Sequence, residues 1–246
     1  MYALVNVRLG STRLPGKVLK KIGDVTSLEL LVSRIRMSKR IDDVIVNTST
    51  NPIDDEIIDL CLAKGLLHSR GAEDDVLGRM IGACHQFKID RFVEIFGDCP
   101  LIDYRIIDYA VDTFEDEQWD FVGNDLKTTY PPGFEVEVIN AAALIESGNL
   151  CRDPEIREHG SLFIRQNPDR YRVKNFEWSG VPSVPLPHLT LDTQEDYELI
   201  CRVHEACSGI YGDSYSLENV IALVEDRPSL LQINEHIPRK WNKYRE

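Results

Sequence analysis

The order of apolar runs in the first half of the chain limits its fold more than any other feature. Four short runs, mostly rich in β-branched residues, predict buried strands at residues 2–7, 44–47, 66–68 and 92–96. The segments between and after them show helical spacing at residues 27–37, 54–64, 76–87 and 102–114. Strands that alternate with helices in this way build a mostly parallel sheet with helices on both faces.

The second half changes character, and an inserted, protruding β-rich arm is expected at about residues 125–185. Apolar and acidic residues alternate over 134–139, which predicts a half-exposed strand. Further strands are expected at 171–178 and 189–191, and helices at 141–147, 156–165, 193–207 and 217–224. No repeat, low-complexity tract or clear linker interrupts the chain, so residues 1–246 are interpreted as a single domain.

The charge balance argues against several classes of protein. The chain has 28 basic and 41 acidic residues, a formal charge of −13, which makes it a poor binder of nucleic acid. No apolar run reaches the roughly 18 to 20 residues that cross a bilayer, and no signal peptide is recognised. The six cysteines lack C-x-x-C spacing, so free, mostly buried thiols and a cytoplasmic location are expected.

Three possible metal ligands, Cys201, His204 and Cys207, share one side of a predicted helix. A zinc site needs about four ligands, and no second cluster is present in the sequence. A helix face packed in the core is therefore the favoured interpretation.

A Gly-rich basic turn directly follows the first predicted strand. Residues 8–22 contain five basic side chains and no acidic one. Glycines allow backbone N–H groups to approach a ligand, and hydroxyl and cationic side chains complete a polyphosphate site. The candidate ligands are Arg8, Gly10, Ser11, Arg13 and Lys17. Val18 stands where a Walker loop requires Ser or Thr, and an exposed basic turn is the alternative.

Two aspartates follow predicted strands, Asp98 after residues 92–96 and Asp192 after 189–191. Ligands of open α/β sheets bind at the carboxyl ends of the strands. Two carboxylates near a triphosphate there would suit Mg²⁺, although a turn or capping role is the alternative for each. Thr193 and Asp196 predict a capping box for the next helix, so Asp192 is not needed to cap this helix.

A polar loop at 69–79 leads into a predicted helix and offers further contacts. Arg70 and Gly71 are candidates for contact with a base or ribose, and Arg79 lies one helical turn inside. The alternative is a capped helix start, with Asp74 or Asp75 near its N-terminus.

Four motifs occur in order: Arg-x-Gly-Ser-x-Arg-x-x-Gly-Lys, Asp-Asp-Val-Leu-x-Arg, Gly-Asp-Cys-Pro-Leu-Ile-Asp and Leu-x-Asp-Thr-x-Glu-Asp. In this order they resemble the cytidylyltransferase superfamily, which activates sialic-type and 3-deoxy-octulosonic sugars as CMP-sugars. The branch most similar to this chain is that of the SpsF-like spore-coat polysaccharide enzymes. The resemblance implies a Rossmann-like, three-layer nucleotidyltransferase fold, a homodimer, Mg²⁺, CTP and a 2-keto-3-deoxy sugar acid.

The resemblance also implies roles for particular residues. Nucleotide contacts are expected from Arg8, Gly10, Ser11, Arg13, Lys17, Arg70, Gly71, Asp75, Arg79 and Asp98. Metal ligands are expected to be Asp98 and Asp192, and catalytic residues Arg8, Lys17 and Asp192. Sugar contacts are expected from Tyr130, Gly133, Glu135, Glu137, Arg157 and His159.

The chain departs from the pattern of this branch at two places. Asn6 and Val7 replace the usual Gln-Ala before the first arginine, and Pro132 and Phe134 replace a polar and a smaller residue on the sugar side. These changes leave the identity of the sugar open.

The expected reaction is in-line attack of a sugar hydroxyl on the α-phosphate of CTP, with release of pyrophosphate. Asp192 and a metal-bound water are both open as the general base. The rival interpretations are a different nucleoside triphosphate, a GT-A-like glycosyltransferase and a non-catalytic nucleotide-binding protein.

Overall fold

The strand-like runs of the first half form the centre of a seven-stranded sheet in the computed structural model, which describes residues 1–239. The parallel strands are β5 (Leu67–Gly71), β4 (Asp43–Ser49), β1 (Tyr2–Asn6) and β6 (Arg91–Phe96), adjacent in this order. β8 (Glu137–Asn140) follows and is antiparallel to both of its neighbours. β7 (Phe121–Gly123) and β9 (Val173–Asn175) complete the sheet as a parallel pair. The predicted mixed, mostly parallel sheet is confirmed.

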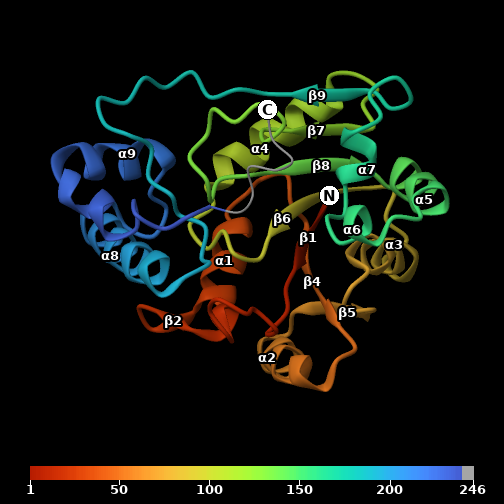
Figure 1. The fold of residues 1–246 in the computed structure, drawn as a ribbon, viewed down its shortest axis with the longest axis horizontal. Helices are drawn as coiled ribbons and strands as arrows, with labels where there is room; N and C mark the ends of the chain where they lie inside the picture. Colours follow the sequence, from red (N-terminus) through yellow and green to blue (C-terminus); the bar gives the residue numbers. More distant parts are fainter. Residues whose placement is uncertain (240–246) are drawn as a thin grey trace.

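Helices cover both faces of this sheet (Figure 1). Val5, for example, packs into one apolar cluster, whereas Leu4 packs into the other, as the two-residue period of a strand requires. The first face is covered by α1 (Ser27–Ile35), α2 (Asp55–Lys64), α4 (Tyr104–Glu115), α8 (Gln194–Tyr211) and α9 (Leu217–Asp226). The second face is covered by α3 (Val76–Phe87), α5 (Ala141–Leu150), α6 (Pro154–Arg157) and α7 (Leu162–Arg165).

The predicted helix ends are largely observed. Thr193 and Asp196 form the expected capping box of α8, and Gly65 ends α2 in the left-handed conformation with φ 63°. All six cysteines are free, and all except Cys201 are buried. His204 contacts the Tyr215 hydroxyl at 3.1 Å.

Several expectations for the second half are wrong. Residues 125–185 contain only two strands, β8 and β9, and more helix than strand, so this stretch is not β-rich. Residues 134–139 are buried on both sides, and only part of them is strand. Residues 189–191 form no strand, although the Leu191 amide donates a hydrogen bond to the Asp98 carbonyl at 2.7 Å.

The predicted helix at 156–165 is two short helices, because Gly160 between them has φ 51°. A Cβ atom at Gly160 would lie 2.8 Å from the Met80 sulfur, so a side chain there would clash. The sequence analysis also missed β7 and the small hairpin of β2 (Lys21–Ile22) and β3 (Val25–Thr26), which are too short for a clear period. Among residues 1–239, no helix is both long and apolar enough to cross a membrane.

Arg34 joins α1 to two distant parts of the chain. Its buried guanidinium donates hydrogen bonds to the carbonyls of Ile102, Asp213 and Tyr215 at 2.7–2.8 Å, and it stacks on the Tyr215 ring at 4.0 Å. The planar fork of arginine suits such a set of acceptors, and lysine does not reproduce it.

We expect Arg34→Ala to lower the free energy of unfolding by about 3 kcal/mol or more, because three carbonyls lose a charged donor. Arg36→Ala is the matched control. Its side chain is 43% exposed and pairs with Asp43 at the surface, so a loss within about 1 kcal/mol is expected. Urea denaturation of both variants measures the difference, and equal losses would contradict the role of Arg34.

Candidate active site

A cavity of about 710 Å³ lies at the carboxyl ends of the parallel strands. Ten of the predicted site residues line it: Arg8, Gly10, Ser11, Arg13, Lys17, Arg79, Asp98, Glu135, His159 and Asp192. Seven others are not among its lining residues: Arg70, Gly71, Asp75, Tyr130, Gly133, Glu137 and Arg157. The structure therefore brings together the turn after β1, Asp98 after β6 and Asp192 just before α8.

The turn after β1 is closed by its own backbone and by one buried carboxylate. The amides of Ser11 and Gly16 donate to the Leu9 carbonyl at 2.8 and 3.2 Å, and Gly16 has φ 67°. The Leu9 amide donates to Asp54 at 2.7 Å, and the Ser49 hydroxyl also donates to Asp54. Asp54 thus fixes the turn to the end of β4, a role the sequence analysis did not assign.

Lys17 connects the two predicted metal ligands. Its Nζ atom lies 3.0 Å from Asp98 Oδ2 and 3.0 Å from Asp192 Oδ1. Arg13 contacts the other oxygen of Asp192 at 2.9 Å. Burial disfavours the charged form of Lys17, yet the two carboxylates hold its pKa above the ordinary value. Burial likewise opposes ionisation of Asp192, but Lys17 and Arg13 hold its pKa below the ordinary value.

The two aspartates fit a divalent cation that is shared with a ligand. They face a single point, which the Lys17 ammonium occupies, so this place already accommodates positive charge between two carboxylates. Among residues 1–239, no group of three or more His, Cys, Asp or Glu side chains is arranged to hold a metal ion. Phosphate oxygens and water would have to complete the coordination, as is usual for Mg²⁺.

Two arginines lie further along the cavity. Arg8 pairs with Glu158 at 3.2 Å, which connects the turn to the segment after α6. Arg79 donates to the carbonyls of Ala72 and Glu73 at 2.7 and 2.9 Å. Burial and the nearby Arg8 charge lower the pKa of Arg79.

The predicted residues outside the cavity have structural partners. Arg70 pairs with Asp55 at 2.7 Å, and Asp75 both accepts from the Gly78 amide and pairs with Arg157 at 2.7 Å. Gly71 packs so closely on Arg79 that a Cβ atom would lie 2.6 Å from its side chain. Tyr130 packs among aromatic rings, and Gly133 lies against the backbone of Leu189.

A hydrogen-bonded chain of polar side chains crosses four adjacent strands beside the cavity. Ser69 on β5 donates to Asn47 on β4 at 2.7 Å. Asn47 donates to Asn6 on β1 at 2.7 Å, and Asn6 donates to Glu94 Oε1 on β6 at 2.8 Å. We call these four residues the polar ladder. All its donors point towards Glu94, and Asn6 is one of the residues that depart from the family pattern.

The polar ladder ends in a group of four residues, of which only Glu137 was predicted as a site residue. Glu94 is paired in register with Glu137 on β8. Arg165 contacts Glu137 at 3.2 Å and Asp125 at 2.9 Å. We call Glu94, Asp125, Glu137 and Arg165 the buried acidic cluster. Burial raises the pKa of Glu94 to about 7 and that of Glu137 well above the ordinary value, and a hydrogen bond joins the two carboxyls.

Two sequence signals pointed to this cluster: the acidic residue inside the apolar run of β6, and Glu137, which the resemblance gives as a sugar contact. Its four members lie far apart in the chain, and their contact depends on the pairing of β6 with β8 and on the position of α7.

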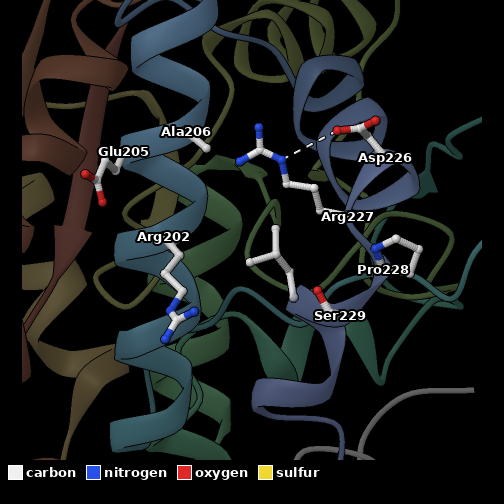
Figure 2. Close-up of a pocket in the computed structure, with 8 residues that line it drawn as sticks. Arg202, Glu205, Ala206, Asp226, Arg227, Pro228 and Ser229 are labelled. Carbon is white, nitrogen blue, oxygen red and sulfur yellow. Dashed lines mark ion pairs between the residues drawn. The ribbon is translucent and has the colours of Figure 1, made fainter.

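A second cavity, of about 750 Å³, lies between α8, the end of α9 and the following 3₁₀ helix Pro228–Ile233 (Figure 2). Arg227 pairs there with its neighbour Asp226 at 3.5 Å, and Arg202 points from α8. The lining residues include none of the predicted site residues, so the first cavity is the candidate active site.

A basic Gly-rich turn that faces two carboxylates, on an α/β sheet of this order, is typical of nucleotide-binding proteins. The comparisons with known proteins agree. A family model described as cytidylyltransferase matches residues 2–237. The chain therefore belongs to the cytidylyltransferase family.

Individual relatives support this assignment. The chain is 33% identical over 211 residues to the spore coat polysaccharide biosynthesis protein SpsF of Bacillus subtilis, covering 82% of this chain and 85% of SpsF. A cytidylyltransferase structure from Leptospira borgpetersenii superposes with a TM-score of 0.87 at 31% identity, covering 96% and 98% of the two chains. The CTP complex of CMP:2-keto-3-deoxy-manno-octonic acid synthetase shares the fold, with a TM-score of 0.64 at 15% identity over 83% and 98%.

The raised pKa of Glu94 gives a prediction for stability. Between pH 4.5, its ordinary pKa, and about pH 7 the folded chain retains a proton that the unfolded chain releases. The stability of the wild type therefore falls as pH rises through this window. Glu94→Gln has no such proton to lose, so its stability relative to the wild type should rise by a few kcal/mol from about pH 5 to about pH 8.

Denaturant unfolding of both proteins at several pH values measures this difference. Asn6, Asp125, Glu137 and Arg165 lie near Glu94 and are present in both proteins, so the difference between the two pH profiles reports the replaced carboxyl. Parallel pH profiles for the two proteins would contradict the raised pKa.

Proposed function

We propose that this protein is a cytidylyltransferase that transfers CMP from CTP to a hydroxyl group of a small sugar and releases pyrophosphate. The observation that carries the proposal is the meeting of Arg13 and Lys17 with Asp98 and Asp192 in one cavity beside the turn after β1. A triphosphate needs cations, and its bound metal needs carboxylates. The choice of CTP rests on the family, and a 2-keto-3-deoxy sugar acid is the acceptor that the resemblance implies.

In this proposal the turn after β1 binds the triphosphate. The backbone around Gly10 and the Ser11 hydroxyl approach the phosphates, while Arg8, Arg13 and Lys17 supply positive charge. The sugar hydroxyl forms a new bond to the α-phosphorus as the bond to the β-phosphate oxygen breaks. Lys17 and Arg13 stabilise the negative charge that develops on pyrophosphate. As the nucleotide binds, Lys17 and Arg13 exchange their contacts with Asp192 for contacts with the phosphates.

Asp98 and Asp192 would hold Mg²⁺, which when bound neutralises phosphate charge and aligns the reacting groups. Because Lys17 and Arg13 keep the pKa of Asp192 low, this carboxylate suits cation binding better than proton abstraction. The base that accepts the hydroxyl proton is left unassigned.

Three further properties belong to the same proposal. They are a single nucleotidyltransferase domain over residues 1–246, a homodimer and a cytoplasmic location. The resemblance supports the first two, and the free cysteines are compatible with the third. Sedimentation of the purified protein measures the oligomeric state.

The proposed reaction is tested by pyrophosphate release with Mg²⁺ and each of CTP, UTP, GTP and ATP. We expect release with CTP, and loss of release when a chelator removes the divalent cation, because Asp98 and Asp192 without a bound cation would repel the triphosphate. Excess Mg²⁺ should restore the rate. A chain that binds none of the four nucleotides is not a nucleotidyltransferase.

The role of Lys17 gives a second prediction. Lys17→Ala should lower turnover by a factor of about 10² or more, because the departing pyrophosphate loses a positioned cation. Lys127→Ala is the matched control. Lys127 pairs with Glu177 on the surface, its side chain is 66% exposed, and it lies outside the cavity lining. Steady-state kinetics and thermal unfolding separate lost catalysis from lost folding, and a near-wild-type rate for Lys17→Ala would remove Lys17 from the mechanism.

A further inference from the structure

The segment that follows the 3₁₀ helix Pro228–Ile233 contacts the residues on both sides of Asp192. The side-chain amide of Asn234 donates to the His188 carbonyl at 2.9 Å and to Asp196 Oδ1 at 2.7 Å. One acceptor precedes Asp192 in the chain and the other follows it. A single buried side chain, 3% exposed, therefore joins the two flanks of a proposed metal ligand.

Arg239 strengthens the same contact. Its guanidinium lies 3.0 Å from Asp196 Oδ1 and 3.1 Å from Oδ2, and it also donates to the Asn234 carbonyl at 3.1 Å. Asp196 is fully buried, and a buried carboxylate is stable only with a cation and hydrogen-bond donors around it. Asn234 and Arg239 supply both, and we call these two residues the Asp196 clamp.

The Asp196 clamp reaches Asp192 through its immediate neighbour. Asp196 Oδ2 accepts hydrogen bonds from the Thr193 amide at 2.9 Å and from the Thr193 hydroxyl at 3.0 Å. On the other side, the Leu191 amide donates to the Asp98 carbonyl at 2.7 Å. Asp192 therefore lies between two fixed residues, one held by Asp196 and the other bonded to the backbone of the second proposed metal ligand.

We propose that Asn234 and Arg239 are positioning residues, which hold the Asp192 carboxylate where it can share a divalent cation with Asp98 and a triphosphate. The inference rests on the proposed function, because it concerns the same metal site. Neither residue is among those that line the cavity, so both act through Asp196 rather than by contact with the nucleotide. Mg²⁺ demands near-ideal geometry, and residues that orient a metal ligand typically contribute about 10- to 100-fold in metal affinity.

The test is the dissociation constant of CTP, measured by calorimetry with a chelator and again with Mg²⁺. The ratio of the two constants isolates the metal's contribution to binding, because the turn after β1 is available to the phosphates under both conditions. We expect Asn234→Ala to lower this ratio by about tenfold or more and to leave the metal-free dissociation constant within about twofold of the wild type. Arg239 still neutralises Asp196 in this variant, so it should fold.

Three arginine variants give the matched comparison. Arg239→Ala should lower the ratio as Asn234→Ala does. Arg239→Lys keeps the charge beside Asp196 but loses the planar fork, so its ratio should fall between those of Arg239→Ala and the wild type. Arg227→Ala is the control, because Arg227 is 54% exposed and pairs with its neighbour Asp226. Its ratio should equal that of the wild type.

The outcomes separate this inference from the proposed function. Thermal unfolding identifies the folded variants, and if Arg239→Ala does not fold, Asn234→Ala and Arg239→Lys decide. An unchanged ratio in folded Asn234→Ala overturns the positioning role, while Mg²⁺-dependent binding by the wild type still supports the proposed function. Equal losses with and without Mg²⁺ also overturn it, because the metal-free complex does not need Asp192. A wild type that does not bind CTP contradicts the proposed function itself.

Discussion

The polar ladder is the constraint on which the cavity side of the sheet depends. Four side chains on neighbouring parallel strands lie where most of the surrounding residues are apolar, and each of its three hydrogen bonds needs the strands in their observed register. A shift of one residue would turn Asn6 and Asn47 to the opposite face. The ladder therefore ties the positions of β5, β4, β1 and β6 to one another, and their carboxyl ends form the site.

The strands and helices of the first half could be predicted from sequence because local period decides them. The 2–7 run, for example, is mostly apolar and buries side chains on both faces of the sheet, whereas the helix at 76–87 buries one face at helical spacing. The turn after β1 was predictable for a similar reason, since Gly10, Arg13 and Lys17 are close together in the sequence. Asp192 could be found because the capping box of α8 leaves it unused.

The missed residues have long-range causes. Asp54 looks like an ordinary residue at a helix start, and only the folded chain shows that it accepts the Leu9 amide. Arg165 lies in a segment that was expected to be one continuous helix, whereas Gly160 divides it and lets α7 approach the sheet. Glu137 was predicted as a sugar contact on a half-exposed strand, but it is fully buried beneath Arg165 of α7. Local patterns contain no information on these pairings.

The contact of Lys17 with Asp98 and Asp192 has a consequence for how the site responds to its surroundings. Without a nucleotide, Asp98 and Asp192 are the counterions of Lys17, so this cation does not need to bind anions from solution. When a metal–nucleotide complex enters, charges exchange partners within the cavity and few are released to bulk solvent. The affinity should therefore depend less on ionic strength than the number of arginines and lysines suggests, since salt screens exposed charges more than buried ones.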